Sequence, residues 1–432
     1  MEARNLQAFI NEQKVGELHD ENGIWRFLYD ALWVLNPEGF GLSPALPKQA
    51  APITDGGSLR PVQWYFDNLL PEEGARYLLA KDAQLHIEDA FGLLSAYGAE
   101  SAGSLTLVSE KPSAEYGTTP LTDEQLQTRI ERLPSVPLTH GAAKRMSLAG
   151  VQHKLAVIFR AGELLEPVGN TPSTYILKPN HSDSDYPHSV INEYFTMRLA
   201  KSLRLDVPRV LRRYVPAPIY LVERFDRRSE GDAVKRLHLI DACQALNLDR
   251  QFKHRGGSVE RLRDLVDQCA VPVAAKLKLF QWLIFNLLVG NSDAHLKNIS
   301  FLVDARGVRL APFYDMLAVG VYASNAFQKR EWPKTPLAFP LLGCRSFQEI
   351  TVQALLDIAS VFGIRAATAR RLIQEQVSRI EATADELLHE IEAENAELST
   401  NRPALAASFA GETRCVCAIA KVVIHDMVAR LS

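Results

Sequence analysis

Two aspartates and an asparagine in the second half of the chain have the types and spacing that most clearly predict chemistry. The segment GNSDAHLKN contains Asp293 and, five positions later, Asn298, and the segment PFYD ends at Asp315, 17 positions beyond Asn298. A carboxylate can align a hydroxyl nucleophile and accept its proton. A second carboxylate and an amide oxygen are hard donors that Mg²⁺ accepts. We therefore predict Asp293 as a catalytic base, and Asn298 and Asp315 as magnesium ligands.

The same spacing occurs in protein kinases. Their catalytic loop carries an Asp that receives the substrate hydroxyl proton and an Asn, five residues on, that holds Mg²⁺, and a metal-binding Asp follows. A D-x4-N match is frequent by chance, and taken alone it is better explained as a loop with helix-capping residues. The context favours the kinase interpretation, because a long apolar segment precedes Asp293 and a strand-turn-strand pattern precedes Asp315.

Three upstream features are consistent with a nucleotide site. Lys178 lies in the strand-like segment TYILKPN, from which its ammonium would reach the α- and β-phosphates. Glu193, on a predicted helix, would pair with Lys178, or else it is an exposed acid near the helix N-terminus. The segment SLAGVQHK (147–154) would offer backbone N–H groups to phosphates, although it is neither G-x-G-x-x-G nor Walker A and a plain turn is the alternative.

Two charge clusters and one histidine have competing interpretations. Residues 198–236 hold eleven Lys or Arg against five Asp or Glu, a net of +6, which fits a phosphate-rich cleft or a nucleic-acid surface, although a solvated face is favoured. Residues 381–397 hold seven acids and no Lys or Arg, as on the polar side of a helix. No second His or Cys stands at ligand spacing near His295, so a structural or phosphate-contacting role is favoured over a metal ligand.

Composition restricts the class of protein. The 432 residues predict two to four domains, and an apolar fraction of 47% with a net charge of −3 indicates a globular chain without a strong positive field. Five scattered cysteines without C-x-x-C favour a reducing compartment. No signal peptide is expected, and the most apolar stretch, KLFQWLIFNLLVG, is too short for a membrane span. We expect a soluble cytoplasmic protein.

Periodicity places these residues on elements. Strands are expected around a turn at Asn11-Glu12-Gln13 and over Ile24 to Leu35, helices from Val62 to Tyr97, and a connecting segment at 109–140 with one short helix from Thr122. Strands with one helix follow to 225. Beyond Asp241 the pattern is largely helical, with a hairpin turning at Ala305-Arg306-Gly307 and a long amphipathic face. That face comprises Ile373, Val377, Ile380, Ala384, Leu387 and Ile391. A ligand cleft is expected near the junction at 225.

Six collinear segments resemble the HipA family of serine/threonine kinases, the toxins of HipBA-type toxin–antitoxin systems. They are SLAGVQHK (147–154), YILKPN (175–180), NEYFTMRLAKSLRLDVP (192–208), YLVERFDRR (220–228), GNSDAHLKNIS (290–300) and LAPFYDML (310–317). FDNLLPEE (66–73) and GAESAGSLTL (98–107) are similar to the family's N-terminal segment. The resemblance covers nearly the whole chain.

The resemblance implies an α+β, divergent bilobal kinase-like fold, with an α/β N-terminal lobe, an all-helical C-terminal lobe and ATP·Mg²⁺ between them. The implied divisions are an N-terminal subdomain at 1–108, a kinase N-lobe at 109–225 and a helical C-lobe at 226–432. Asp293 is the implied catalytic base, and Asn298 and Asp315 bind the metal. Ser147 matches an autophosphorylation site. The implied nucleotide contacts in the phosphate loop are Gly150, Val151, Gln152, His153 and Lys154. Lys178 is the implied contact to the α- and β-phosphates, and Glu223 and Phe225 are the implied contacts to adenine at the hinge. The other implied nucleotide contacts are His295, Lys297, Asn298 and Asp315.

The resemblance also implies partners. They are a small helix-turn-helix antitoxin similar to HipB, DNA reached mainly through that antitoxin, and a translation component such as an aminoacyl-tRNA synthetase as the phosphorylated protein, with no membrane. Alternatives are a corepressor with little kinase activity and a small-molecule kinase. The chain departs from the family at His153, where an acid is common, and at the bulkier Leu148 and Val151.

Overall fold

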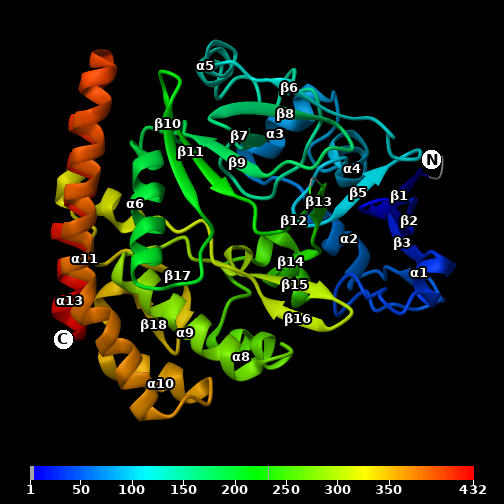
Figure 1. Ribbon diagram of the computed structural model, residues 1–432. Helices are drawn as coiled ribbons and strands as arrows, with labels where there is room; N and C mark the ends of the chain where they lie inside the picture. The colour runs from blue at the N-terminus through cyan, green and yellow to red at the C-terminus, as the bar shows by residue number, and fades with distance from the viewer. Residues whose placement is uncertain (1–3, 232) are drawn as a thin grey trace. The chain divides into compact units, whose positions relative to one another are not determined.

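The computed structural model of the protein describes residues 4–231 and 233–432. They form two compact units, each assembled from separate stretches of the chain (Figure 1). The first unit contains the described residues up to Pro179, Leu221–Lys253 and Ser300–Ala311, and the second contains Asn180–Tyr220, His254–Ile299 and Pro312–Ser432. The three-part division at 108 and 225 stays a prediction.

An antiparallel five-stranded sheet opens the first unit, in the order β4-β3-β2-β1-β5. Its strands are β1 (Arg4–Ile10), β2 (Gln13–Glu21), β3 (Ile24–Tyr29), β4 (Ile53–Thr54) and β5 (Leu105–Val108). The expected turn between β1 and β2 is confirmed. The strand expected to reach Leu35 ends at Tyr29, because Asp30 accepts a hydrogen bond from the Leu32 N–H and starts a short helix, α1 (Ala31–Leu35). The expected helical region follows as α2 (Pro61–Asp67), α3 (Glu73–Asp82) and α4 (Ala90–Tyr97).

A second antiparallel sheet of the first unit carries Lys178. Four neighbouring strands of this six-stranded sheet lie entirely in the first unit, in the order β6-β8-β7-β9, namely β6 (Tyr116–Pro120), β8 (Glu163–Gly169), β7 (Leu155–Arg160) and β9 (Tyr175–Pro179). The short helix expected from Thr122 is α5 (Asp123–Glu131), and a capping box between Thr122 and Gln125 explains its start.

The later segments of the first unit are mostly strands, which corrects the description of residues 226–432 as all-helical. Two of the pairs, β12–β13 and β15–β16, are hairpins between adjacent segments, and β14 pairs with the distant β15, where burial of short apolar segments overrides the helical pattern around them. The elements are β11 (Pro218–Glu223, which enters from the second unit), β12 (Arg227–Glu230), β13 (Ala233–Arg236), β14 (Leu239–Asp241), α7 (Ala242–Ala245), η1 (Arg250–Phe252), β15 (Ser300–Asp304) and β16 (Gly307–Leu310). The hairpin expected at 305–307 is confirmed between β15 and β16.

The second unit is mainly helical. Up to Asn298 it contains α6 (Ser189–Ser202), β10 (Val210–Tyr214), α8 (Val259–Asp267), α9 (Pro272–Leu288) and η2 (Leu296–Asn298). Beyond Asp315 it contains η3 (Val319–Ala323), η4 (Asn325–Phe327), β17 (Pro336–Leu341), β18 (Cys344–Ser346), η5 (Phe347–Glu349), α10 (Val352–Val361), α11 (Ala366–Asn401), η6 (Pro403–Leu405), α12 (Ala406–Ala418), η7 (Ile419–Ile424) and α13 (His425–Leu431). The long orange-to-red helix in Figure 1 is α11, and it buries the predicted amphipathic face.

Charges of the second unit pair across its helices. Arg198 of α6 bonds to Glu390 and Glu394 of α11. Arg212 of β10 has a side chain only 2% exposed and donates to Glu412 at 2.9 Å. The acidic stretch is the polar side of a helix, as expected. The prediction that residues 198–236 form a solvated face is wrong for Arg212. Its guanidinium can be buried because carboxylates distant in the sequence compensate its charge.

Membrane insertion through a helix finds no support in this fold. Among the residues that the structure describes, no helix combines the length and the apolar composition that crossing a bilayer requires.

Candidate functional site

The loop that carries Asp293 is held by buried asparagines at the end of α9. The Asn286 side-chain amide donates to the Trp282 carbonyl at 2.8 Å, and its oxygen accepts from the Asn291 amide at 2.7 Å. The Asn291 side-chain oxygen in turn accepts from the Asp293 backbone N–H at 3.1 Å. This chain of hydrogen bonds ties the loop to a helix buried in the core of the second unit, so the position of Asp293 is fixed by a rigid element.

Asn298 lies beside the backbone of Asp293. Its side-chain amide nitrogen donates to the Asp293 carbonyl at 2.8 Å, which identifies the opposite atom of the amide as the oxygen. Asn298 is buried, whereas the Asp293 side chain is 60% exposed. A substrate hydroxyl approaching from solvent can therefore reach the carboxylate, while the amide oxygen is kept in one orientation.

The segment that ends at Asp315 is anchored to the same loop. The Tyr314 hydroxyl donates to the Lys297 carbonyl at 2.9 Å, and the Phe313 ring stacks on Trp282 of α9 with centroids 5.7 Å apart. Asp315 itself has a φ of +57°, in the left-handed region that non-glycine residues rarely adopt. The surrounding contacts hold this backbone in an unfavourable conformation, as is common at functional sites.

Glu193 and Asp315 share a neighbour in the second unit. Burial raises the pKa of Tyr220 well above its ordinary value, and the nearby carboxylates of Glu193 and Asp315 raise it further. Glu193 is 1% exposed, so its interpretation as an exposed helix-terminal acid is wrong. Lys178 is buried on β9 of the first unit. Its pairing with Glu193 would join the two units and stays a prediction.

Gly290 determines how α9 turns into the loop that carries Asp293. Its φ is +66°, and a Cβ at this position would lie 2.7 Å from Val423 Cγ1 and 2.9 Å from the Trp332 ring. Gly290→Ala is therefore expected to destabilise the protein by about 2–5 kcal/mol, from left-handed strain of about 1–2 kcal/mol and overpacking of about 1–3 kcal/mol. Urea unfolding measures this loss. Gly343→Ala is the control, because its φ is also positive but no atom lies within 4 Å of its Cβ position. Equal losses for the two variants would contradict the packing argument.

Residues 147–154 form a loop of the first unit, and hydrogen bonds link this loop to other segments of that unit. Gly150 has a φ of +109°, and its carbonyl accepts from the Glu72 N–H at 3.2 Å. The Lys154 ammonium donates to the Ala149 carbonyl at 2.6 Å, and the Gln152 side chain donates to the Pro179 carbonyl at 3.0 Å. The residues predicted to cradle phosphates, Gly150, Val151, Gln152, His153 and Lys154, are all partly exposed.

Ser147, at the start of this loop, is fully buried. Its hydroxyl donates to the Leu69 carbonyl at 3.0 Å, and its backbone N–H donates to the Glu100 carbonyl at 2.8 Å. A phosphate on this hydroxyl would bring negative oxygens against a carbonyl that can only accept hydrogen bonds. The modified side chain is incompatible with this buried position.

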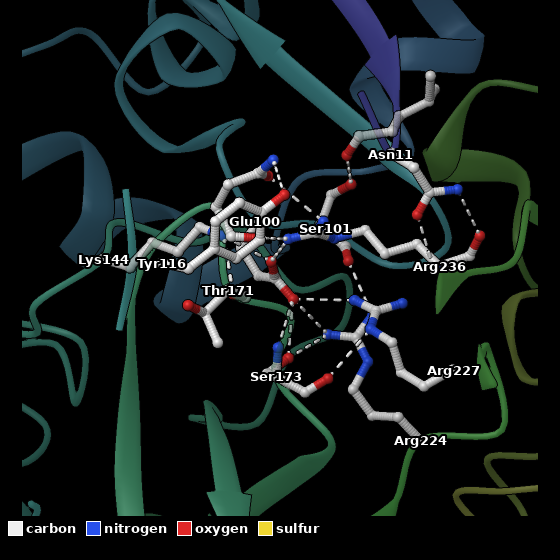
Figure 2. A network of polar contacts seen from close by, with 12 residues as sticks. Asn11, Glu100, Ser101, Tyr116, Lys144, Thr171, Ser173, Arg224, Arg227 and Arg236 are labelled. Atoms are coloured by element: carbon white, nitrogen blue, oxygen red, sulfur yellow. Dashed lines mark hydrogen bonds and ion pairs between the residues drawn. The ribbon is translucent and has the colours of Figure 1, made fainter. Parts of the chain in front are cut away.

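Glu100 is the centre of a buried charge cluster in the first unit (Figure 2). One carboxylate oxygen accepts from Lys144 at 2.9 Å and Arg236 at 3.1 Å, and the other accepts from Arg227 at 2.8 Å and Arg224 at 3.3 Å. Each of these side chains is 5% exposed or less. The favoured interpretation of residues 198–236 as a solvated face is therefore wrong for three arginines as well as for Arg212.

The electrostatics of this cluster depend on its carboxylates. Burial alone would raise the pKa of Glu100, but Lys144, Arg227, Arg236 and Arg224 together hold it well below its usual range. Burial lowers the pKa of Arg227 to about 10, with Arg224 adding to the effect. Asp226 supplies a second carboxylate by pairing with Arg224 at 2.7 Å. The cluster joins the segment before Ser147 to the strands that follow Glu223.

The remaining predicted residues fall in two places. Glu223 ends β11 and is exposed, and Phe225 follows it with partial exposure. His295 and Lys297 are buried in the loop of the second unit that carries Asp293. Phosphate-loop and hinge residues thus lie in the first unit, and Asp293, Asn298 and Asp315 lie in the second. Asn291, Glu100 and His254 could not be identified from the sequence, because a lone Asn, Glu or His carries no local spacing signal.

Known proteins resemble the chain along most of its length. Residues 6–108 match the family described as the HipA N-terminal domain, and residues 146–384 match the HipA-like C-terminal domain. The Sinorhizobium fredii protein Y4mE is 35% identical over 337 residues, which cover 74% of this chain and 79% of that protein. The serine/threonine-protein kinase toxin HipA of Shewanella oneidensis is 33% identical over 336 residues, covering 73% and 76% respectively.

A solved structure extends this similarity to the fold. In the complex of Shewanella oneidensis MR-1 HipA, HipB and operator DNA, one chain matches with a TM-score of 0.76 and 28% identity. The match covers 98% of the present chain and 99% of the other. The mixed helix and strand fold expected from the sequence is confirmed by this match.

Proposed function

The chain belongs to the HipA family of kinases, and on that premise we propose that it transfers the γ-phosphoryl group of ATP to a serine or threonine hydroxyl of a protein. The observation that carries the proposal is the catalytic loop itself. An exposed carboxylate, Asp293, stands on a rigid loop whose own backbone orients the amide of Asn298. This is the arrangement that phosphoryl transfer requires, since its catalysis consists mainly of positioning and electrostatic stabilisation.

Asp293 acts on the acceptor in this proposal. Its carboxylate receives a hydrogen bond from the serine or threonine hydroxyl, aligns the oxygen with the γ-phosphorus and takes the proton as the new bond forms. The Asp293 backbone N–H donates to Asn291 and the Asp293 carbonyl accepts from Asn298, so the backbone is held on both sides of the carboxylate. No reorganisation of the loop is then needed during the transfer.

Asn298 and Asp315 would hold Mg²⁺. The donor set fits the ion, because a carboxylate and an amide oxygen are hard ligands and the Asn298 nitrogen is already engaged with the Asp293 carbonyl. When bound, the ion neutralises charge on the phosphates. Lys178 would bind the α- and β-phosphates from β9, and Gly150, Val151, Gln152, His153 and Lys154 would surround the phosphates. Glu223 and Phe225 would contact adenine, and His295 and Lys297 would complete the nucleotide site.

We further propose a cellular role as the toxin of a type II toxin–antitoxin system. Support comes from the relative named as a kinase toxin and from the structure of a relative with HipB and operator DNA. In this role a small helix-turn-helix antitoxin binds the chain, and DNA is reached mainly through the antitoxin. The acceptor would be a translation component, for example an aminoacyl-tRNA synthetase, whose phosphorylation arrests growth.

Transfer of labelled phosphate tests the activity. The purified full chain, incubated with ATP and Mg²⁺ in a cell extract, is expected to label one or a few proteins, and its own mass is expected to rise in steps of about 80 Da. Label recovered only in small metabolites would favour the small-molecule kinase. No transfer to any acceptor, together with tight binding to the antitoxin, would contradict the kinase proposal and favour the corepressor.

Ser147 is the expected site of self-modification. Because its hydroxyl is buried against the Leu69 carbonyl, phosphorylation requires the loop to leave its position and prevents its return. Ser147→Asp is therefore expected to reduce ATP affinity at least tenfold, whereas Ser147→Ala keeps the affinity and loses the modification. Nucleotide binding and peptide mass mapping measure both effects. Equal ATP affinity in the Asp variant and the unmodified chain would contradict the loop mechanism.

A further inference from the structure

Two histidines face the catalytic carboxylate within the second unit. His254 Nε2 lies 3.9 Å and His295 Nε2 lies 3.8 Å from the same oxygen, Asp293 Oδ1. The three potential ligand atoms all lie within 4.8 Å of one another. The two rings stand nearly perpendicular, at 80°, with centroids 5.0 Å apart. His254 is 41 positions from His295, so the pair is formed by the fold and is invisible to ligand spacing in the sequence.

The orientation of His254 is fixed by a bond at its far nitrogen. Its Nδ1 lies 3.0 Å from the Ala338 carbonyl of β17, and a carbonyl can only accept a hydrogen bond. The Nδ1 atom therefore carries the proton, and in the neutral imidazole the lone pair is on Nε2, the atom that faces Asp293. Metal-binding histidines commonly have such a bond to a carbonyl at the nitrogen that does not bind the metal.

The burial of the three groups suits a site with an entrance. The side chain of His295 is 9% exposed, so the surrounding atoms hold this ligand in one position on the buried side of the site. The side chains of His254 and Asp293 are 43% and 60% exposed, so an ion can enter from solvent and keep a water molecule as its fourth ligand. Bonds of about 2.0–2.1 Å in a tetrahedral site put ligand atoms about 3.3 Å apart. The two distances from the histidines to Asp293 Oδ1, 3.9 Å and 3.8 Å, exceed this spacing by about half an ångström, and the ligand atoms of the two histidines lie within 4.8 Å of each other. Rotation of the exposed His254 and Asp293 side chains can close these gaps.

We propose that His254, His295 and Asp293 form a site for a divalent transition-metal ion of the zinc class, and that an ion bound there inhibits phosphoryl transfer. Imidazole nitrogens select Zn²⁺ and similar ions over Mg²⁺, which prefers oxygen. Asp293 cannot coordinate the ion and accept the substrate proton at the same time. The inhibition rests on the proposed kinase function, whereas the binding site itself does not.

Metal binding is tested first, without nucleotide. Co²⁺ added to the full chain is expected to give the visible absorption of a tetrahedral site, and Zn²⁺ is expected to displace it at one equivalent. His254→Ala should weaken Zn²⁺ binding at least tenfold. His389→Ala is the matched control, because His389 is exposed on α11 of the same unit. All five free cysteines stay in both variants, so any binding of Zn²⁺ by thiols is the same in each. Equal Zn²⁺ binding by His254→Ala and the unchanged chain would therefore overturn the proposed site.

Inhibition is tested next, at free Zn²⁺ concentrations set by a metal buffer in excess Mg²⁺·ATP. Activity of each variant is expressed relative to its own activity without Zn²⁺. The unchanged chain and His389→Ala are expected to lose transfer at a free Zn²⁺ concentration at least tenfold below that needed for His254→Ala. Coincident curves would overturn the inhibitory role. A chain that binds Zn²⁺ through His254 but transfers no phosphate without Zn²⁺ would instead contradict the proposed function and leave the metal site standing.

Discussion

Replacing Asp293 by alanine is expected to lower the rate of phosphoryl transfer by about 10²–10⁴-fold, the range that a positioned general base contributes. Folding is expected to be unchanged, because the side chain is 60% exposed and the loop is held through backbone groups and asparagine side chains. Transfer of labelled phosphate at saturating ATP measures the rate. ATP affinity should change little, since Asp293 acts on the acceptor hydroxyl.

Asp357→Ala is the matched control for this prediction. Asp357 is an exposed aspartate on α10 of the same unit, and its carboxylate accepts from Gln353 one helical turn away. This variant should keep full activity and a similar midpoint in thermal unfolding. Transfer retained in Asp293→Ala within a factor of about three would remove Asp293 from the role of base and, with it, the main support for the proposed mechanism.

Replacing Glu100 by glutamine is expected to destabilise the first unit by about 3–5 kcal/mol at neutral pH. The variant leaves Lys144, Arg224, Arg227 and Arg236 buried with Asp226 as the remaining carboxylate of the cluster, and breaking a buried ion pair by removing one partner costs this amount. Equilibrium unfolding in urea measures the loss. Glu163→Gln is the control, since Glu163 is exposed on β8 of the same unit.

The pH dependence of this effect has a definite sign. The folded protein holds the pKa of Glu100 well below the ordinary value of 4.5. The stabilisation is therefore fully present above pH 4.5 and is lost as the pH falls toward the folded-state pKa. The difference in unfolding free energy between Glu100→Gln and the unchanged chain should narrow below pH 4.5. A difference under about 1 kcal/mol at pH 7 would contradict the structural importance of the cluster.

The same variant should release the segment before Ser147. Lys144 bonds to the Glu100 carboxylate, and Ser147 bonds to its backbone carbonyl. Arg145 between them is exposed and offers a tryptic site. Faster tryptic cleavage after Arg145 in Glu100→Gln than in Glu163→Gln would show that the carboxylate restrains this segment.

The sequence by itself determined the elements whose signals are local and the order of the candidate site residues along one loop. The apolar periodicity of α11, the capping residue of α5 and the hairpin at 305–307 were all predictable, because each depends on interactions within a few residues. The resemblance to the HipA family was readable from collinear segments. The chemistry of Asp293 and Asn298 was inferred from spacing in one loop, where local geometry links the two residues.

Only the tertiary structure decided which distant charges meet. Arg224, Arg227 and Arg236 have the composition of an exposed basic face, yet they surround a carboxylate more than 120 positions earlier. His254 lies near Asp293 because β17 holds its ring, and no spacing in the sequence indicates it. Whether a charge is solvated or buried depends on partners brought together by folding, because the free energy of burying a charge is set by its three-dimensional surroundings and not by its neighbours along the chain.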